Sequence, residues 1–544
     1  PLARCDLCPL KRNDSCPPSY NNDAKLVIIG EGPGHYEIEK QQPFIGKSGN
    51  VVWRAVRKAG LSRDSCHVTN ATLCIPDHKL TPKEWKLALE CCKPRLEAEL
   101  SSVKNTNTAL VLGGRALQAV SDHGQITNWA GAPLERPFAG RVWKLLPCIH
   151  PAAALHGKPE LLPIISFWIR RAVRLAQGIL ELDTWQQSVV EPGKLQLAAL
   201  RRICNESVAI DVETAKEDSA KKHNELTDTL ICVAFAGEHE TVSIRYPFDE
   251  ETYLVVSDML SDLNVEKIFH NAQFDIFILE LAGFVIRGPI FDTMLAHNVV
   301  APQLPHNLGF VAATLTTFER WKTPPHPTLA LLMRYNAKDA AATWVIAQRL
   351  KKQLKTTYHG ESRFIVDTKL STIALKMKRR GMYVSRDAMK QHGAVLRKRK
   401  AQKLWEFRAE MALEFGSRRT YKLGKNGQNP PLKELFFDNL NCIPIRYSEE
   451  TKEPKLDALT LEKYAAEGSE KVRRLARLTL DYRKDSKLLS TYIEGLTISP
   501  DGCVHVSFKI HGPITGRWSS TPNIQNQPPI MRNIWAPRPG RILV

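Results

Sequence analysis

The run Val208-Ala209-Ile210-Asp211-Val212-Glu213 decides the fold expected for the middle of the chain. Its apolar and β-branched side chains are typical of a strand, and strand-like stretches follow at 230–236 and 241–246. From Asn271 the sequence turns largely helical, so the pattern predicts a mixed α/β domain. Because every second side chain of a strand points to the same face, Asp211 and Glu213 project together.

Three more side chains of suitable chemistry lie downstream of this strand. Tyr335 and Asp339 are four residues apart in a helical segment and share a face, and Asp275 opens another helix. Each of them alone is more simply explained as a solvated surface group. Together, four carboxylates and a tyrosine indicate a site for divalent cations, which take oxygen ligands.

The motifs Asp-x-Glu at 211–213, Asn-x-x-Phe-Asp at 271–275 and Tyr-x-x-x-Asp at 335–339 resemble the tyrosine-containing DEDD class of 3′-to-5′ exonucleases. The resemblance implies a ribonuclease H-like domain over residues 195–355 that trims single-stranded 3′ ends. It also implies two Mg²⁺ or Mn²⁺ ions, one generating hydroxide and the other stabilising the leaving 3′ oxygen. Tyr335 would orient the attacking water, and the ligands would be Asp211, Glu213, Asp275 and Asp339. RNA-trimming enzymes carry the same acids, so the neighbouring sections decide the substrate.

The first section of the chain alternates strands with helical patterns. Strand-like runs lie at 25–29, 66–69, 109–112 and 141–149. The alternation predicts a doubly wound parallel sheet with functional loops at the strand ends.

This section also holds cysteines at the spacing of metal ligands. Cys5 and Cys8 form a close pair, and Cys74 and the Cys91-Cys92 doublet are candidates to complete a site. From spacing alone, zinc, an iron–sulfur cluster and buried structural cysteines all stay open.

Five motifs of the first section occur in a set order: Gly30–Glu37, Pro43–Gly49, Thr69-Asn70, Leu112-Gly113 and His150–Ala152. Together they resemble the iron–sulfur uracil-DNA glycosylases. The resemblance implies a glycosylase-like domain over residues 1–185. It also implies a 4Fe–4S cluster, with the ligands Cys5, Cys8, Cys74 and Cys92.

The same resemblance gives roles to single residues. A glycosylase rotates its base out of the helix, stacks it on an aromatic face and reads its edge. Here Phe44 would supply the face and Asn70 would read the edge, while Glu37 would help to exclude the thymine methyl. His150 would donate to the departing base, and Glu31 would activate water or stabilise the sugar cation.

Two positions depart from the glycosylase pattern, since Gln42 stands where the family usually has Gly and Ser48 where it has Ala. A non-catalytic uracil- or DNA-binding module therefore stays open as the alternative for this domain.

The last section, residues 356–544, has long basic helical patterns. Residues 361–544 hold 35 basic and 19 acidic side chains, whereas residues 191–360 hold 17 and 21. The segments 481–492 and 515–528 resemble the thumb and the start of the palm of family A DNA polymerases. The resemblance implies that primer-template DNA is bound, with minor-groove donors from Arg517, Asn523, Gln525 and Asn526.

The order of the three sections resembles bacteriophage-type family A polymerases, which act in DNA replication and repair. In that family the catalytic carboxylates of the palm follow the last motif found here. We therefore expect that this length of chain does not polymerise by itself and that dNTPs are substrates of a longer form.

Composition agrees with a multidomain DNA-binding protein. The chain has 544 residues, 43% of them hydrophobic, and a net charge of +19 that favours a polyanionic partner. No stretch approaches the ~20 apolar residues that span a bilayer. We expect a monomer in the cytoplasm, or in the host cytoplasm if the source is viral, with replication accessory proteins as candidate partners and no membrane.

Overall fold

The structure of the chain is a computed structural model. It describes residues 2–11, 13–76, 80–180, 183, 194–203, 207–215, 229–322, 328–415, 422–423, 430–448, 453–513, 515–538 and 540. The chain divides into two compact units, Pro1–Ser371 and Thr372–Val544. The apolar run at 542–544, which predicts the opening of a buried strand, lies outside the described residues.

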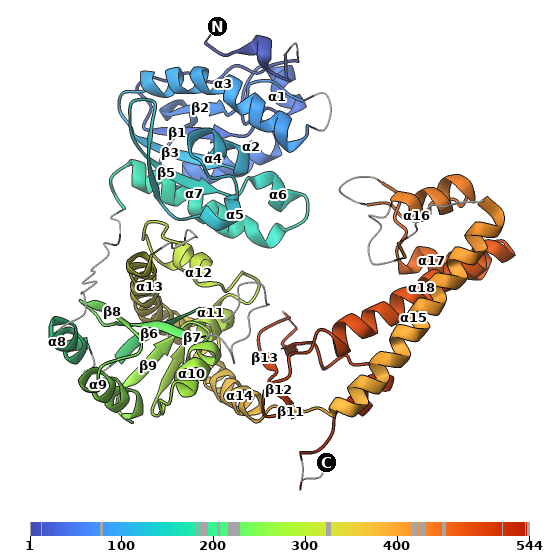
Figure 1. Cartoon of the computed structure of the whole chain (residues 1–544). Coiled ribbons are helices and arrows are strands. Elements are labelled where there is room, and N and C mark those ends of the chain that lie inside the picture. The colour runs from blue at the N-terminus through green and yellow to red at the C-terminus, as the bar shows by residue number, and fades with distance from the viewer. Residues whose placement is uncertain are drawn as a thin grey trace. The chain divides into compact units, whose positions relative to one another are not determined.

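The first sheet of unit 1 has the strand order β2-β1-β3-β5-β4 (Figure 1). Four of its strands run parallel, as predicted: β1 (Leu26–Gly30), β2 (Cys66–Asn70), β3 (Thr108–Leu112) and β5 (Arg141–Cys148). The edge strand β4 (Leu134–Phe138) pairs antiparallel with β5. The sequence did not predict β4, which turns back through a tight hairpin where Ala139 and Gly140 adopt positive φ.

Helices cover both faces of this sheet, because alternate residues of each buried strand face opposite sides. Leu26, Ile28 and neighbouring strand residues pack on one side against α2 (Lys47–Lys58), α6 (Pro151–Leu155) and α7 (Leu162–Ala176). Val27, Ile29 and their neighbours pack on the other side against α3 (Pro82–Ser102), α4 (Gly114–Val120) and α5 (Ile126–Trp129). The short helix α1 (His35–Lys40) follows the glycine-rich turn after β1.

The second sheet of unit 1 has the order β10-β9-β6-β7-β8. The antiparallel strands β6 (Ser207–Ala215), β7 (Thr229–Ala236) and β8 (Thr241–Arg245) confirm the three strands expected from the sequence. The parallel strands β9 (Glu266–Phe269) and β10 (Ile290–Asp292) were not predicted. They are only four and three residues long, too short to give a clear alternation.

The helices of the second sheet's domain confirm a mixed α/β fold. The core that joins the sheet to α11, α12 and α13 contains Ala209, Ile268, Ala296, Val311 and Ile346. The helices are α8 (Lys194–Ile203), α9 (Glu250–Ser261), α10 (Ala272–Leu281), α11 (Thr293–Val300), α12 (Leu308–Leu315) and α13 (Leu329–Thr356). The next helix, α14 (Gly360–Arg380), contains the boundary between the two units in its sequence.

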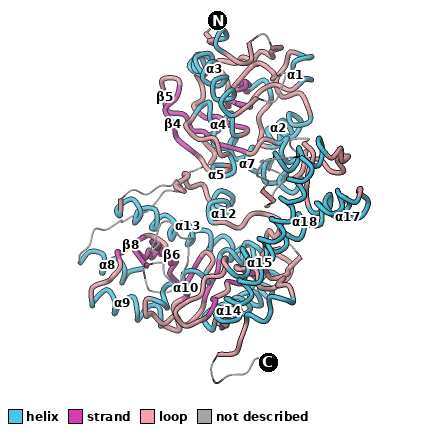
Figure 2. Tube along the Cα trace, turned by 45° about the vertical axis from the view of Figure 1, so that its right-hand side comes forward, coloured by secondary structure: helices cyan, strands magenta, loops and turns pink. Residues whose placement is uncertain are grey.

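Unit 2 is mostly helical, as Figure 2 shows by its colours. Its long helices α15 (Arg386–Phe415) and α18 (Glu470–Leu488) share a core with α17 (Ala458–Glu467), built around Phe407, Phe436 and Leu475. The remaining elements are short: α16 (Pro430–Glu434), β11 (Met382–Tyr383), β12 (Cys503–Val504), β13 (Ser507–Lys509) and β14 (Ser519–Thr521).

In the part of the chain that the structure describes, none of the helices has the length and apolar character that a bilayer span requires.

Candidate active sites

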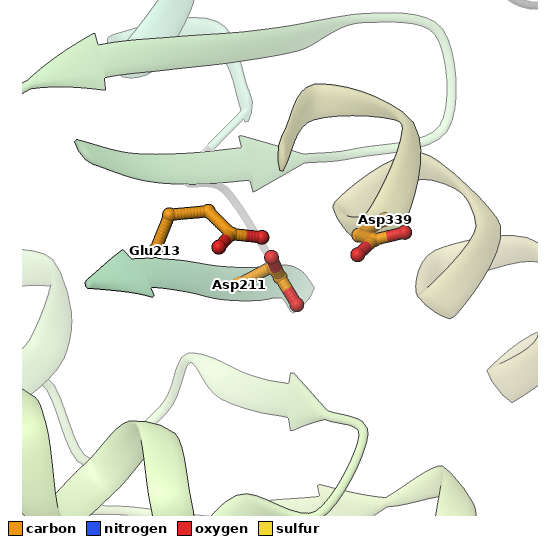
Figure 3. Close-up of side chains that lie close together, drawn as sticks. All are labelled: Asp211, Glu213 and Asp339. Atoms are coloured by element: carbon orange, nitrogen blue, oxygen red, sulfur yellow. The ribbon is translucent and has the colours of Figure 1, made fainter. Parts of the chain in front are cut away.

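Three carboxylates meet beside the second sheet. Asp211 and Glu213 project from β6 and Asp339 from α13, and one carboxylate oxygen of each lies within 4.8 Å of the others (Figure 3). We call these three residues the acidic centre. The two-residue spacing on a strand, as expected, places the first pair on one face.

Asp275 and Tyr335, the other two predicted site residues of this domain, lie next to the acidic centre. Asp275 is buried on α10, and its Oδ1 accepts the backbone N–H of Val212, the residue between the two strand acids, at 3.2 Å. Tyr335 lies one helical turn before Asp339. Asp275 therefore borders the acidic centre without joining the 4.8 Å group.

Several polar side chains that the sequence did not single out hold the acidic centre in place. Asn336 donates to Oδ2 of Asp211 at 2.8 Å and accepts a hydrogen bond from Ser243. Trp321 donates from Nε1 to Oδ1 of Asp339 at 2.6 Å. Lys322 donates from Nζ to Oδ2 of the same carboxylate at 2.5 Å and to the hydroxyl of Tyr335 at 2.7 Å.

Crowding of like charges away from water changes the acidity of the acidic centre. Burial and the nearby Asp339 raise the pKa of Glu213 to about 7. Burial, with repulsion from Asp339 and Asp275, also raises the pKa of Asp211 well above its usual range. A divalent cation would relieve this repulsion, so the donor set fits oxygen-loving metal ions.

A second group of predicted residues meets at the end of β1. A side chain at Gly30 would collide with Oδ1 of Asn70 and would lie 2.6 Å from Cζ of Phe44, so both side chains pack on this glycine. The rings of Phe44 and His150 have their centroids 6.2 Å apart. We call Gly30, Glu31, Phe44, Asn70 and His150 the Phe44 cluster.

The Phe44 loop is held in an unusual backbone conformation. Phe44 has φ of +56°, and its carbonyl accepts the indole N–H of Trp53 at 2.7 Å. Arg63 donates to the carbonyl of Pro43 at 2.5 Å. A Cβ at Gly49 would collide with the Phe44 carbonyl, so the motif glycine permits this close approach.

His150 is arranged as a neutral hydrogen-bond donor. It caps α6, and its Nδ1 accepts the backbone N–H of Ala152 at 3.2 Å, which places the proton of the neutral ring on Nε2. Burial lowers the pKa of His150, although the charge of Glu31 opposes this shift. The ring therefore stays neutral near pH 7.

The two glutamates of the glycine-rich turn have different surroundings. Glu31 accepts the backbone N–H of Arg115 near the start of α4 at 3.0 Å, and its Cδ would lie 2.5 Å from a Cβ at Gly113. Glu37 accepts the backbone N–H of Gly34 at 2.8 Å and so caps α1. The Glu37 carboxylate therefore stabilises the glycine-rich turn.

A buried ion pair supports the end of β2, and the sequence did not predict it. Arg95, on α3, donates to the carbonyls of Asn70 and Ala71 at 2.8 and 2.9 Å. It also pairs with Glu99, four residues further along α3, at 2.8 Å. Arg95 donates to the Thr69 hydroxyl, and that hydroxyl donates to the Glu99 carboxylate. This pair fixes the backbone that carries Asn70.

The predicted cysteine ligands converge between the N-terminus and α3. The backbone N–H of Arg4 donates to the carbonyl of Cys91, and Cys8 and Cys74 pack on Leu10, Leu80 and Ala88. Burial, with the neighbouring thiols of Cys92, Cys8 and Cys5, raises the pKa of Cys74 to about 11. Cys91 also lies beside Cys8. Cys5 is exposed, Cys8 and Cys74 are half-buried and Cys92 is buried. In the part of the chain that the structure describes, the acidic centre is the group of metal-binding side chains gathered within 4.8 Å, and these thiols are not gathered so closely. By their chemistry, four soft sulfur donors fit an iron–sulfur cluster or zinc.

The predicted DNA-binding residues of unit 2 are exposed around and after β14. Arg517, Asn523, Gln525 and Asn526 all face solvent. The carbonyl of Asn526 accepts the hydroxyl of Tyr492 at 3.2 Å, and its N–H donates to Oδ1 of Asn523. The segment is thus anchored to the end of the thumb-like helices while its donors stay available.

Comparison with known proteins identifies the first domain. The sequence model of the uracil DNA glycosylase superfamily matches residues 17–169. The type-4 uracil-DNA glycosylase of Archaeoglobus fulgidus is 30% identical over 163 residues, which cover 79% of that protein and 29% of this chain. Through its N-terminal domain, the chain belongs to the type-4 uracil-DNA glycosylases. The enzyme of the same name from Thermotoga maritima is 29% identical, with 88% of that protein and 31% of this chain covered.

The other two domains of this type-4 glycosylase chain match DNA polymerase families. The models for 3′-5′ exonuclease and DNA polymerase family A match residues 194–355 and 399–540. DNA polymerase I of Synechocystis sp. is 27% identical over 362 residues, 61% of this chain and 35% of that protein. The chain thus spans about a third of the length of this polymerase relative.

A solved structure has the same fold over much of the chain. The polymerase domain of Pol1 from M. smegmatis, solved in complex with DNA primer-template and dNTP, superimposes with a TM-score of 0.50 at 20% identity. The match covers 65% of this chain and 59% of that chain. The predicted order of a glycosylase-like, an exonuclease and a family A polymerase domain is confirmed, whereas the bacteriophage likeness stays a prediction.

Proposed function

We propose that the first domain of this chain removes uracil from DNA. The observation that carries the proposal is the Phe44 cluster, in which an aromatic face, an amide, a neutral imidazole and a carboxylate meet. Phe44 would stack on the extruded uracil and Asn70 would read its edge. The Nε2–H of His150 would donate to the departing base, and Glu31 would stabilise the positive charge on the sugar.

An alkali-cleavage assay tests uracil excision. An oligonucleotide with one uracil, incubated with the full chain and then with alkali, should break at the uracil, and Glu31→Ala should abolish the break. Uracil-dependent binding without scission would refute excision and support the non-catalytic binding module.

We further propose that Cys5, Cys8, Cys74 and Cys92 bind a 4Fe–4S cluster. When bound, the cluster would join the N-terminal segment, the loop after β2 and α3 through four thiolates. Iron and sulfide analysis with an absorbance spectrum separates this cluster from zinc. Zinc without sulfide would overturn the proposal.

For the second domain we propose metal-dependent trimming of DNA 3′ ends. The proposal rests on the acidic centre, whose three carboxylates lie within 4.8 Å of one another. Asp211, Glu213 and Asp339 would hold divalent cations with Asp275 close by, and Tyr335 would orient the attacking water. When bound, the metal ions would supply an activated water and stabilise the leaving oxygen.

A 5′-labelled single strand tests the trimming reaction. In Mg²⁺ the full chain should shorten it, and Asp211→Asn should stop this. Asp258→Asn, an exposed carboxylate on α9, is the matched control and should trim at the normal rate. Undiminished trimming by Asp211→Asn would refute the assignment of the acidic centre.

The remaining parts of the proposal concern the whole protein. By its likeness to family A DNA polymerases, unit 2 would bind primer-template DNA and serve dNTP-dependent synthesis in DNA replication or repair. We also propose domain limits of 1–185, 195–355 and 356–544. A monomer in the cytoplasm, acting with replication accessory proteins, completes the proposal.

A further inference from the structure

The last turn of α12, in the exonuclease domain, is capped by a side chain from the glycosylase domain. Arg171 lies on α7 and is only 7% exposed. Its guanidinium donates to the carbonyls of Ala313 and Thr314 at 2.6 and 3.0 Å. The last four carbonyls of a helix have no hydrogen-bond partner within the helix. Arg171 supplies donors for two such carbonyls of α12, although Arg171 and Ala313 are 142 residues apart in the sequence.

Further contacts join the two domains at this point. Trp168, also on α7, donates from Nε1 to the carbonyl of Ala313 at 3.3 Å, and its ring meets Phe310 edge-on. Arg171 also donates to the carbonyl of Gly131 at 2.9 Å, which ties the cap to the glycosylase domain. The end of α12 is therefore anchored to α7 by both aromatic packing and charge-assisted hydrogen bonds.

The stretch that follows α12 is also fixed to residues before the exonuclease domain. The backbone N–H of Arg320 donates to the carbonyl of Pro133 at 3.2 Å. The backbone N–H of Thr317 donates to the carboxylate of Asp183 at 2.6 Å. The backbone of residues 313–320 is thus held at both ends by the N-terminal part of unit 1.

The same stretch ends at the acidic centre. Trp321 and Lys322 donate to the two oxygens of Asp339, and Lys322 also donates to the hydroxyl of Tyr335. Trp321 is buried beside Phe318, so its ring has little freedom to move independently of the backbone. Trp321, whose indole donates to Asp339, comes only eight positions after Ala313, whose carbonyl accepts from Arg171.

We propose that Arg171 is a positioning residue for the 3′-trimming reaction. By capping α12 it fixes residues 313–322, so that Trp321 and Lys322 hold Asp339 and Tyr335 in their working orientation. The inference rests on the proposed exonuclease function and assigns part of that function to a residue of the glycosylase domain. Side chains that orient metal-binding carboxylates typically change activity by about 10- to 100-fold when they are lost.

Trimming kinetics of the full chain test the proposal. We expect Arg171→Leu to lower kcat in Mg²⁺ roughly tenfold. The KM for DNA should stay unchanged, because Arg171 acts on the acidic centre and does not itself bind DNA. Arg171→Lys should retain part of the rate, since an ammonium can still reach one carbonyl. The matched control is Arg174→Leu, an exposed arginine one turn further along α7, which should trim normally.

A double-mutant cycle separates positioning from a general loss of stability. Because Arg171 acts partly through Trp321, Arg171→Leu should lower kcat less in a Trp321→Phe background than in the unaltered chain. Thermal unfolding checks that each variant is folded. If Arg171→Leu does not fold, Trp168→Phe replaces it, because it removes one hydrogen bond to Ala313 and keeps the aromatic packing.

Two results would overturn the proposal: a normal kcat for folded Arg171→Leu, or losses that add in the double variant. Absence of trimming by the unaltered chain would instead refute the proposed exonuclease function, so the two failures can be told apart.

Discussion

At the scale of single residues, the charged carboxylates of the acidic centre lower the stability of the folded chain. Glu213 has a pKa of about 7 in the folded chain instead of its usual 4.5, because burial and Asp339 disfavour its charged form. Between these two values the folded chain binds more protons than the unfolded chain, so its free energy of unfolding falls as pH rises. Mg²⁺ should reverse this loss by neutralising the carboxylates.

Thermal unfolding at pH 5 and pH 8 measures this linkage. We predict that Mg²⁺ raises the melting temperature more at pH 8 than at pH 5. In EDTA at pH 8, Asp211→Asn should raise the melting temperature by about 2–4 °C, as expected for a gain of roughly 1 kcal/mol in the free energy of unfolding. In this variant Mg²⁺ should raise the melting temperature less than in the unaltered chain. A Mg²⁺ effect that is equal at both pH values would contradict the account.

His150 gives a second prediction at this scale. Its lowered pKa and the hydrogen bond from Ala152 make the neutral ring, with its proton on Nε2, the working form. The rate of uracil excision under single-turnover conditions should therefore not fall as pH rises from 6.5 to 8.5. A decrease across this range with a single ionisation would show that the protonated ring is needed.

At the scale of elements, α3 links the cysteines to β2, the strand that ends at Asn70. The helix carries Cys91 and Cys92 on one turn and Arg95 and Glu99 on the next two, where the ion pair holds the end of β2. We predict that Arg95→Ala lowers the free energy of unfolding by about 3 kcal/mol, because the buried Glu99 loses its arginine and keeps only the Thr69 hydroxyl and His67 as neighbours.

Denaturant unfolding checks the role of Arg95, and Lys93→Ala is its control. Lys93 is an exposed cation on the same helix, so its loss should change stability by less than about 0.5 kcal/mol. Similar losses for both variants would argue against a special role for the buried pair.

The strands and the acidic centre show what sequence pattern can and cannot predict. Asp211 and Glu213 could be placed on one face because strand periodicity fixes the direction of each side chain. Trp321 and Lys322 could not be found in this way. They belong to an irregular stretch without periodicity, and they reach Asp339 only through tertiary packing.

The Phe44 cluster follows the same distinction. Its members were identified from the five motifs that resemble the iron–sulfur uracil-DNA glycosylases, not from the periodicity of any element. The side chains that hold the backbone of Phe44 and Asn70 were not predicted. These residues are Arg63, Trp53 and Arg95, which lie within ordinary helical or loop patterns. The edge strand β4 was missed because a short antiparallel hairpin interrupts an otherwise parallel order.

At the scale of the whole molecule, charge is concentrated in the last section, where basic side chains outnumber acidic ones by 35 to 19 over residues 361–544. Binding of primer-template DNA should therefore weaken steeply with salt, by roughly 10³-fold or more between 50 and 200 mM if six or more phosphates are contacted. Arg517→Ala should weaken binding equally for different DNA sequences, because minor-groove acceptors are shared by all base pairs. Fluorescence anisotropy with two unrelated duplexes measures both effects, and a sequence-dependent loss would contradict minor-groove contact.

The central claim is that one chain carries two separate centres that act on DNA. The most direct test uses one single-stranded oligonucleotide with an internal uracil and a 5′ label. Uracil excision is measured in EDTA by alkali cleavage, and trimming is measured in Mg²⁺. The account predicts both reactions for the unaltered chain, trimming alone for Glu31→Ala and uracil excision alone for Asp211→Asn. Loss of both reactions in either folded variant, or loss of neither, would contradict it.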